Sequence, residues 1–182
     1  MYNKLRKLVA LLFVPVFLMI SLYSEKLCFA GLFIVAAGEF IRVWSAGYIR
    51  KNKVLSVVGP YKYVRNPLYV GSLLIGLGFA VFIVNIYIFI IVLATFLYIY
   101  TLQIKSEEKA LESIFGNEYE RYKKNVHRWI PSFKKYRAAN SADDTISFDI
   151  KLAIVKNKEY NAILGCISIV FAILLIRAMF RN

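Results

Sequence analysis

Long apolar runs separated by short polar stretches dominate the chain. Each run is close to the roughly 20 residues that a helix needs to cross a bilayer, and charged residues are rare within them. The pattern therefore predicts membrane-spanning helices over five runs: Leu8–Tyr23, Leu27–Ile49, Leu68–Val84, Ile86–Gln103 and Asn161–Phe180.

The apolar stretch Leu68–Lys105 is too long for a single span. As one helix it would extend about 55 Å, nearly twice the thickness of the hydrocarbon layer. We therefore expect a helical hairpin that turns near Asn85. Small residues in its first half, such as Gly76 and Gly78, would allow a neighbouring helix to approach closely, which we favour, or would leave room for a ligand.

Composition agrees with this pattern and adds an orientation. The chain is 59% hydrophobic and carries a net charge of +13, which we assign to loops that face anionic lipid rather than to nucleic acid. With the N-terminus inside, Lys and Arg number three in residues 1–7, five in 50–66 and twelve in 104–160, against three outside. The basic excess inside predicts a cytoplasmic N-terminus. Together with the five apolar runs, it predicts an all-α, multi-pass integral membrane protein with about five transmembrane helices.

Two polar stretches should then lie on the cytoplasmic side. In Gly59–Gly71, Gly59-Pro60 is typical of a turn, and Asn66-Pro67 is typical of a helix start with Pro at its first position. The other stretch, Lys105–Pro131, has apolar positions at three- and four-residue steps and reads as a helix interrupted at Gly116. We expect the two stretches to meet in one cytoplasmic-face pocket. The alternative for Gly59–Gly71 is a connecting loop with interfacial tyrosines.

This organisation divides the chain into three parts. Residues 1–131 form the membrane core, 132–160 a cytoplasmic linker with a surface-lying helix near Phe148–Val155, and 161–182 a C-terminal transmembrane helix.

Several kinds of site are excluded by composition. The single His127 and the two cysteines, Cys28 and Cys166, lack metal-ligand spacing, so no metal site is expected. No Ser-His-Asp set and no glycine-rich phosphate loop is evident.

The remaining candidates are charged residues. Glu39 and Arg42 share a helical face within a span, where charges mark either function or a mutually neutralising pair. Glu107 and Glu108 lie near many tyrosines, a combination that suits a cationic ligand. Because neighbouring residues differ by about 100° around a helix, only one of these two carboxylates should face a pocket.

The two polar stretches also carry a family resemblance. The sequence Gly59-Pro60-Tyr61-(x)3-Arg65-Asn66-Pro67-Leu68-Tyr69-Val70-Gly71 resembles the G-x-Y-x-x-x-R-H-P-x-Y-x-G signature of isoprenylcysteine carboxyl methyltransferases, which are akin to membrane phospholipid methyltransferases. The second half of the signature matches at Glu107-Glu108, Leu111, Phe115-Gly116, Glu118-Tyr119, Tyr122, Val126, Arg128 and Pro131. The resemblance covers roughly residues 30–131.

The resemblance implies an S-adenosylmethionine-dependent methyltransferase that acts on a lipophilic or lipidated acceptor at the membrane–cytosol interface. It implies cofactor contacts from Lys53, Val54, Leu55, Ser56, Tyr61, Asn66, Pro67, Leu68, Tyr69 and Glu107. Candidate catalytic residues on the acceptor side are Glu39, Arg42 and Arg128.

The chain departs from the prenylcysteine enzymes at two positions. Asn66 stands where they have His, and Gln103 stands where they have an Arg that contacts the substrate carboxylate. The resemblance therefore carries over the cofactor site and leaves the acceptor open. Two other functions stay open as well: a membrane reductase that uses NADPH, and a non-enzymatic membrane scaffold.

Overall fold

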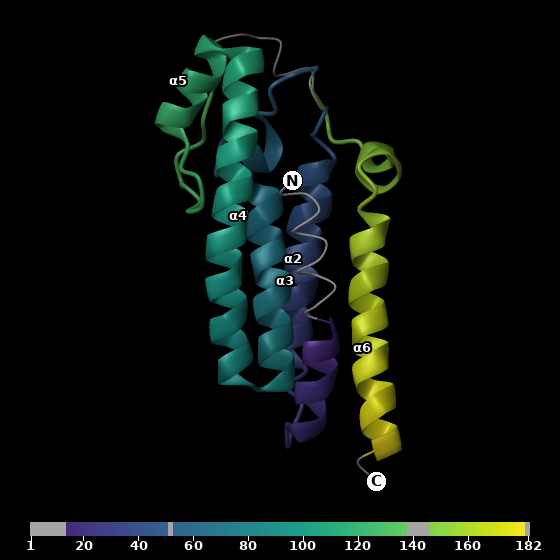
Figure 1. Cartoon of the computed structure of the whole chain (residues 1–182). Helices are drawn as coiled ribbons and strands as arrows, with labels where there is room; N and C mark the ends of the chain where they lie inside the picture. Colours follow the sequence, from purple (N-terminus) through teal and green to yellow (C-terminus); the bar gives the residue numbers. More distant parts are fainter. Residues whose placement is uncertain (1–13, 51–52, 138–145, 181–182) are drawn as a thin grey trace. The chain divides into compact units, whose positions relative to one another are not determined.

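A computed structural model describes residues 14–50, 53–137 and 146–180 of the chain. All regular secondary structure in these ranges is helical, as expected (Figure 1). The elements are α2 (Ala30–Ala46), η1 (Gly59–Lys62), α3 (Pro67–Ile83), α4 (Ile86–Phe115), α5 (Asn117–Asn125), η3 (Leu152–Lys156) and α6 (Tyr160–Phe180). A further helix, Val14–Tyr23, covers most of the expected first span, of which residues 8–13 lie outside the described ranges.

Two of these helices are long and apolar enough to cross a membrane. Among the described residues these are Ile86–Phe115 and Tyr160–Phe180, while Val14–Tyr23 and Pro67–Ile83 are apolar but shorter. The expected count of about five spans therefore stays a prediction. Most apolar side chains of α6 are exposed to the surroundings, as suits a helix that faces lipid.

The elements group into two compact units, each assembled from segments far apart in the sequence. Within the described residues, the first unit comprises 14–39, 73–103 and 161–180, and the second comprises 40–50, 53–72, 104–137 and 146–160. The division of the chain at residues 131 and 160 stays a prediction.

The hairpin predicted around Asn85 is present in the first unit. Helices α3 and α4 run antiparallel on either side of the turn (Figure 1). The Asn85 side chain accepts a hydrogen bond from the Ile88 amide at 3.0 Å, which satisfies one of the free amides at the start of α4. The turn lies there because Asn85 is the polar break in an otherwise apolar run.

Helices α2 and α3 approach each other closely through glycine in the first unit. A Cβ added to Gly78 would lie 2.7 Å from the Val35 amide nitrogen and 2.8 Å from the Gly31 carbonyl oxygen. Both of these atoms belong to the backbone and cannot move aside independently. The expected packing role of this glycine is thus confirmed, and the buried core beside it is Phe17, Val35, Phe79, Ala80, Phe82, Ile83, Ile88, Val92 and Ile173.

Replacing Gly78 by alanine should destabilise the first unit. The added methyl group would push two backbones apart, and overpacking of this kind costs about 1–3 kcal/mol. The measurement is thermal unfolding of the purified protein in detergent. The matched control is Gly165→Ala in α6, where an added Cβ meets nothing within 4 Å. Equal melting temperatures for the two variants would contradict the close approach.

The second unit has its own core, built largely from tyrosines. Its buried members are Leu55, Val57, Tyr61, Tyr119, Tyr122 and Val126. The helix expected over Lys105–Pro131 is interrupted at Gly116, whose φ of 48° few other residues adopt. The prediction that it extends to Pro131 was wrong, because α5 ends at Asn125 and Val126 is extended.

Candidate cofactor-binding site

The loop between α2 and α3 is ordered by its glycine and prolines. Gly59 adopts a φ of 59°, and Pro60 follows it in the first turn of η1. Pro67 is the first residue of α3 and is fully buried. The Asn66 carbonyl accepts the amides of Tyr69 and Val70, each at 3.1 Å. Gly59, Pro60 and Pro67 thus set where η1 and α3 begin, and with that the position of Tyr69.

The chain after α5 runs along this loop and is joined to it by backbone hydrogen bonds. The amide of Arg65 donates to His127 O at 2.9 Å, that of Ser132 to Tyr63 O at 2.8 Å, and that of Tyr136 to Lys62 O at 3.0 Å. The two polar stretches singled out in the sequence therefore meet within the second unit. The same bonds explain the early end of α5, because this segment pairs with the loop instead of continuing as a helix.

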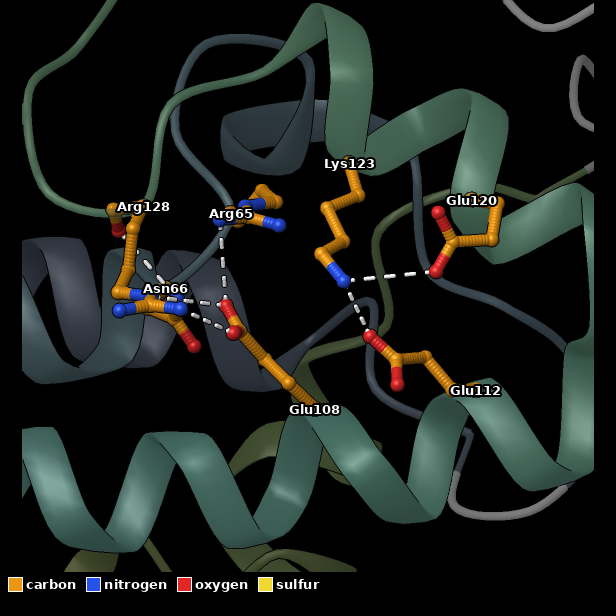
Figure 2. A network of polar contacts seen from close by, with 7 residues as sticks. All are labelled: Arg65, Asn66, Glu108, Glu112, Glu120, Lys123 and Arg128. Atoms are coloured by element: carbon orange, nitrogen blue, oxygen red, sulfur yellow. Dashed lines mark hydrogen bonds and ion pairs between the residues drawn. The ribbon is translucent and has the colours of Figure 1, made fainter.

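A buried ion-pair cluster reinforces the junction, and we define it as Arg65, Glu108 and Arg128 (Figure 2). Arg128 binds the Glu108 carboxylate through two nitrogens, at 3.1 and 2.5 Å. Arg65 Nη2 lies 3.3 Å from Glu108 Oε1. The Glu108 side chain is 7% exposed, and its hydrogen bonds raise the pKa of Arg128 above the ordinary value. Glu108 thereby ties α4 to both converging segments.

The adjacent carboxylate, Glu107, is exposed and takes part in a different contact. The Tyr69 hydroxyl donates to Glu107 Oε1 at 2.6 Å, and the Tyr69 side chain itself is buried. Of the two neighbouring glutamates, Glu108 is buried and Glu107 is exposed, and the expectation that only one of them faces a pocket stays a prediction. The site includes a carboxylate held in place by a buried phenol.

A third carboxylate reaches the second unit from the segment before α6. Glu159 Oε2 lies 2.7 Å from Arg42 Nη2, and Arg42 Nη1 donates to Ser72 Oγ at 2.5 Å. Ser72 follows Tyr69 by three residues in α3, so the two share a helical face. Arg42 therefore links Glu159 to the face of α3 that carries Ser72 and Tyr69.

Tyrosine phenols in this region stay protonated at neutral pH. Burial raises the pKa of Tyr61 most, and the nearby carboxylates Glu107 and Glu159 raise it further. Burial likewise raises the pKa values of Tyr119 and Tyr122. The Tyr122 hydroxyl accordingly donates to the Tyr61 carbonyl at 2.8 Å, which fixes the loop against α5.

The other residues assigned to the cofactor take varied positions. Lys53 and Val54 are exposed, whereas Leu55 is part of the core. The Ser56 hydroxyl donates to Tyr48 O at 2.9 Å. Asn66 donates through Nδ2 to Arg128 O at 3.3 Å, and Leu68 is half-buried. The position that holds His in prenylcysteine enzymes thus carries a side chain that contacts the chain after α5.

The three catalytic candidates are divided between the units. Glu39 belongs to the first unit, where its Oε1 lies 3.3 Å from Cys166 Sγ. Arg42 and Arg128 belong to the second unit. Gln103 is buried in the first unit. The roles assigned to these residues stay predictions.

The sequence singled out Glu108 beside Glu107 but did not predict its ion pairs with Arg65 and Arg128. Leu111 and Phe115 follow Glu108 by three and seven residues and mark its helical face as the inward one.

Two further residues of the second unit, Ser72 and Glu159, were missed from the sequence. Ser72 and Glu159 carry no comparable signal. Glu159 lies 117 residues from Arg42, and only the fold brings them together.

The charges in this region suit a cationic ligand. Glu107 and Glu159 supply two carboxylates and Arg42 one guanidinium, beside the neutral phenols of Tyr61 and Tyr69. Carboxylates and aromatic rings both attract a sulfonium or an ammonium group. The residues present therefore fit S-adenosylmethionine, which carries both groups.

Comparison with known proteins supports the same family. Residues 14–118, more than half of the chain, match the model of the phospholipid methyltransferase family. The cobalt-zinc-cadmium resistance protein CzcN of Cupriavidus metallidurans is 31% identical over 120 residues, which is 65% of this chain and 55% of that protein. The protein-S-isoprenylcysteine O-methyltransferase of Schizosaccharomyces pombe is 36% identical over 100 residues, or 53% of this chain and 41% of that enzyme.

The chain thus spans about half the length of these two curated relatives. An uncharacterized protein of Haemophilus influenzae is 41% identical over 63 residues, which is its whole length and 35% of this chain. No solved structure matches the chain. The extent of the family match shows that the chain belongs to the phospholipid methyltransferase family, whose members are integral membrane methyltransferases that generally use S-adenosylmethionine.

Proposed function

We propose that the protein transfers a methyl group from S-adenosylmethionine to a lipophilic acceptor at the membrane–cytosol interface. It does so as a multi-pass membrane protein whose N-terminus and cofactor pocket are cytoplasmic. The single observation that carries the proposal is the contact between Tyr69 and Glu107 at 2.6 Å. These residues come from the two halves of the family signature and lie in one unit.

The bound cofactor supplies an activated methyl group on a sulfonium, and the chain's residues bind and orient it. Glu107 would balance its positive charge, and Tyr69 holds the Glu107 carboxylate in place. The half-buried side chain of Leu68 would contribute to a slot for the adenine ring. Tyrosine phenols are ordinarily neutral at physiological pH, so Tyr61 and Tyr69 add aromatic faces without adding charge.

Catalysis in this scheme rests on aligning the acceptor with the methyl group and on excluding water from the site. Both matter because the positive charge of the sulfonium is lost as the methyl group passes to the acceptor. Arg128 is bound to Glu108 and acts as a positioning residue that secures the loop. Arg42 is paired with Glu159 in the second unit, and Glu39 lies in the first unit. The acceptor is lipophilic, in keeping with the isoprenylcysteine named for the Schizosaccharomyces pombe relative.

Equilibrium binding of radiolabelled cofactor to the purified full-length protein tests the proposal. We expect saturable binding that S-adenosylhomocysteine displaces and NADPH does not. Incubation of the protein with labelled cofactor and a membrane lipid extract should transfer label to a lipid-soluble product, which mass spectrometry identifies. Absence of binding would favour a scaffold, and displacement by NADPH would favour a reductase.

A further inference from the structure

The segment after α5, residues 126–137, runs back along α4. Helix α4 ends at Phe115, whereas Arg128 contacts Glu108, which lies seven residues earlier in that helix. Seven residues correspond to about 10 Å of helix. Because α4 carries its first charge at Lys105, three residues before Glu108, the segment returns to the place where the apolar part of α4 ends. A bilayer crossed by α4 would have its headgroups at this level.

Backbone hydrogen bonds hold the segment on both sides of its exposed part. The Arg65 amide donates to His127 O at 2.9 Å, and the Tyr136 amide donates to Lys62 O at 3.0 Å. The Tyr136 ring also packs edge-on against the ring of Tyr122, with 5.3 Å between their centroids. The segment is therefore anchored to the loop and to α5, and the side chains between the anchors keep a fixed place on the surface.

The side chains that the anchors hold at the surface combine apolar and basic groups. Ile130 is 73% exposed and Phe133 is fully exposed, although both are large and apolar. Three exposed basic residues lie beside them: Lys134, Lys135 and Arg137. We define these five residues as the amphipathic patch. The chain from residue 121 to residue 137 has seven Lys or Arg and no Asp or Glu. Exposed apolar groups beside positive charge are typical of a surface that meets anionic lipid.

We propose that the amphipathic patch binds an anionic lipid surface, with its two apolar side chains inserted among the headgroups and its three cations paired with lipid phosphates. A lipid surface fits better than a soluble acidic partner, because the segment lies at the level where the apolar part of α4 ends. Such binding requires neither cofactor nor methyl transfer. Because Asn66 Nδ2 donates to Arg128 O in this segment at 3.3 Å, lipid bound here would also hold the candidate cofactor site at the membrane surface.

A fluorescent label at residue 133 of the full-length protein tests the insertion. Phe133→Cys on a Cys28→Ser/Cys166→Ser background receives an environment-sensitive probe, and the protein is placed in nanodiscs of phosphatidylcholine and phosphatidylglycerol. We expect blue-shifted emission, loss of quenching by aqueous iodide, and quenching by spin-labelled lipid. The matched control is Lys124→Cys on the same background, an exposed position of α5, whose label iodide should quench. A label at residue 133 that iodide quenches as strongly as the one at residue 124 would overturn the proposal.

Native mass spectrometry of the protein released from the same nanodiscs tests the cations of the patch. The wild type should retain phosphatidylglycerol in preference to phosphatidylcholine, and Lys134→Gln/Lys135→Gln should lower this preference by about fivefold or more. The control Arg121→Gln/Lys124→Gln removes the same charge from exposed positions of α5. It should keep the preference, because α5 begins beyond the end of α4, away from the apolar part of that helix. Equal losses in the two double variants, or a wild type without the preference, would contradict the proposal.

Discussion

Replacing Glu108 by glutamine is expected to lower the free energy of unfolding by about 3 kcal/mol, because it leaves the buried guanidinium of Arg65 and the half-buried one of Arg128 without their carboxylate. Arg65 and Glu108 have side chains only 9% and 7% exposed. The carboxylate also holds Arg128 through two hydrogen bonds. Its loss would remove the side-chain link, shown in Figure 2, that joins α4 to Arg65 in the loop and to Arg128 in the segment after α5. Denaturant unfolding in detergent micelles measures the effect.

The control is Glu112→Gln, one helical turn further along α4. Glu112 forms an ion pair with Lys123 at the surface (Figure 2), and solvent screens such pairs so that they add little stability. We expect this variant to unfold like the wild type. Similar losses from both substitutions would show that the buried ion-pair cluster has no special role.

Replacing Glu107 by glutamine, or Tyr69 by phenylalanine, should weaken binding of S-adenosylmethionine while the fold persists. Glutamine removes the negative charge, and phenylalanine removes the hydroxyl that orients it at 2.6 Å. Hydrogen bonds to charged groups contribute about 1.5–3 kcal/mol, which corresponds to about a 10- to 150-fold increase in Kd. Equilibrium dialysis with labelled cofactor gives the Kd of each variant.

The Glu112→Gln variant is again the matched control, because it removes the same charge from the same helix away from Tyr69. Its Kd should equal that of the wild type. If the Glu107 and Tyr69 variants bind the cofactor at full strength, this part of α3 and α4 is not the binding site.

Local features of the fold were predictable from the sequence. The turn at Asn85 follows from one polar residue in an apolar run that exceeds the bilayer thickness. The break at Gly116 and the start of α3 at Pro67 follow from the backbone preferences of glycine and proline. The presence of these helices was therefore predictable. The meeting of the two polar stretches was predictable as well, because the hairpin of α3 and α4 brings Lys105–Pro131 back to the end at which Gly59–Gly71 lies.

Features that depend on distant contacts were not predictable. Helix α2 was expected over Leu27–Ile49 but covers Ala30–Ala46, and Asn157 binds carbonyls at its C-terminal end. Helix α5 ends before Pro131 because the following backbone pairs with the loop at Tyr63 and Arg65. The pairing of Arg42 with Glu159 joins residues that no local pattern connects.

Photo-crosslinking of radiolabelled S-adenosylmethionine to the purified protein tests the central claim most directly. Mass spectrometry of the labelled peptides would locate the bound cofactor on the chain. The account predicts saturable adducts in peptides from Lys53–Tyr69 and around Glu107, which S-adenosylhomocysteine prevents. Adducts confined to the helices of the first unit, or labelling that does not saturate, would contradict it.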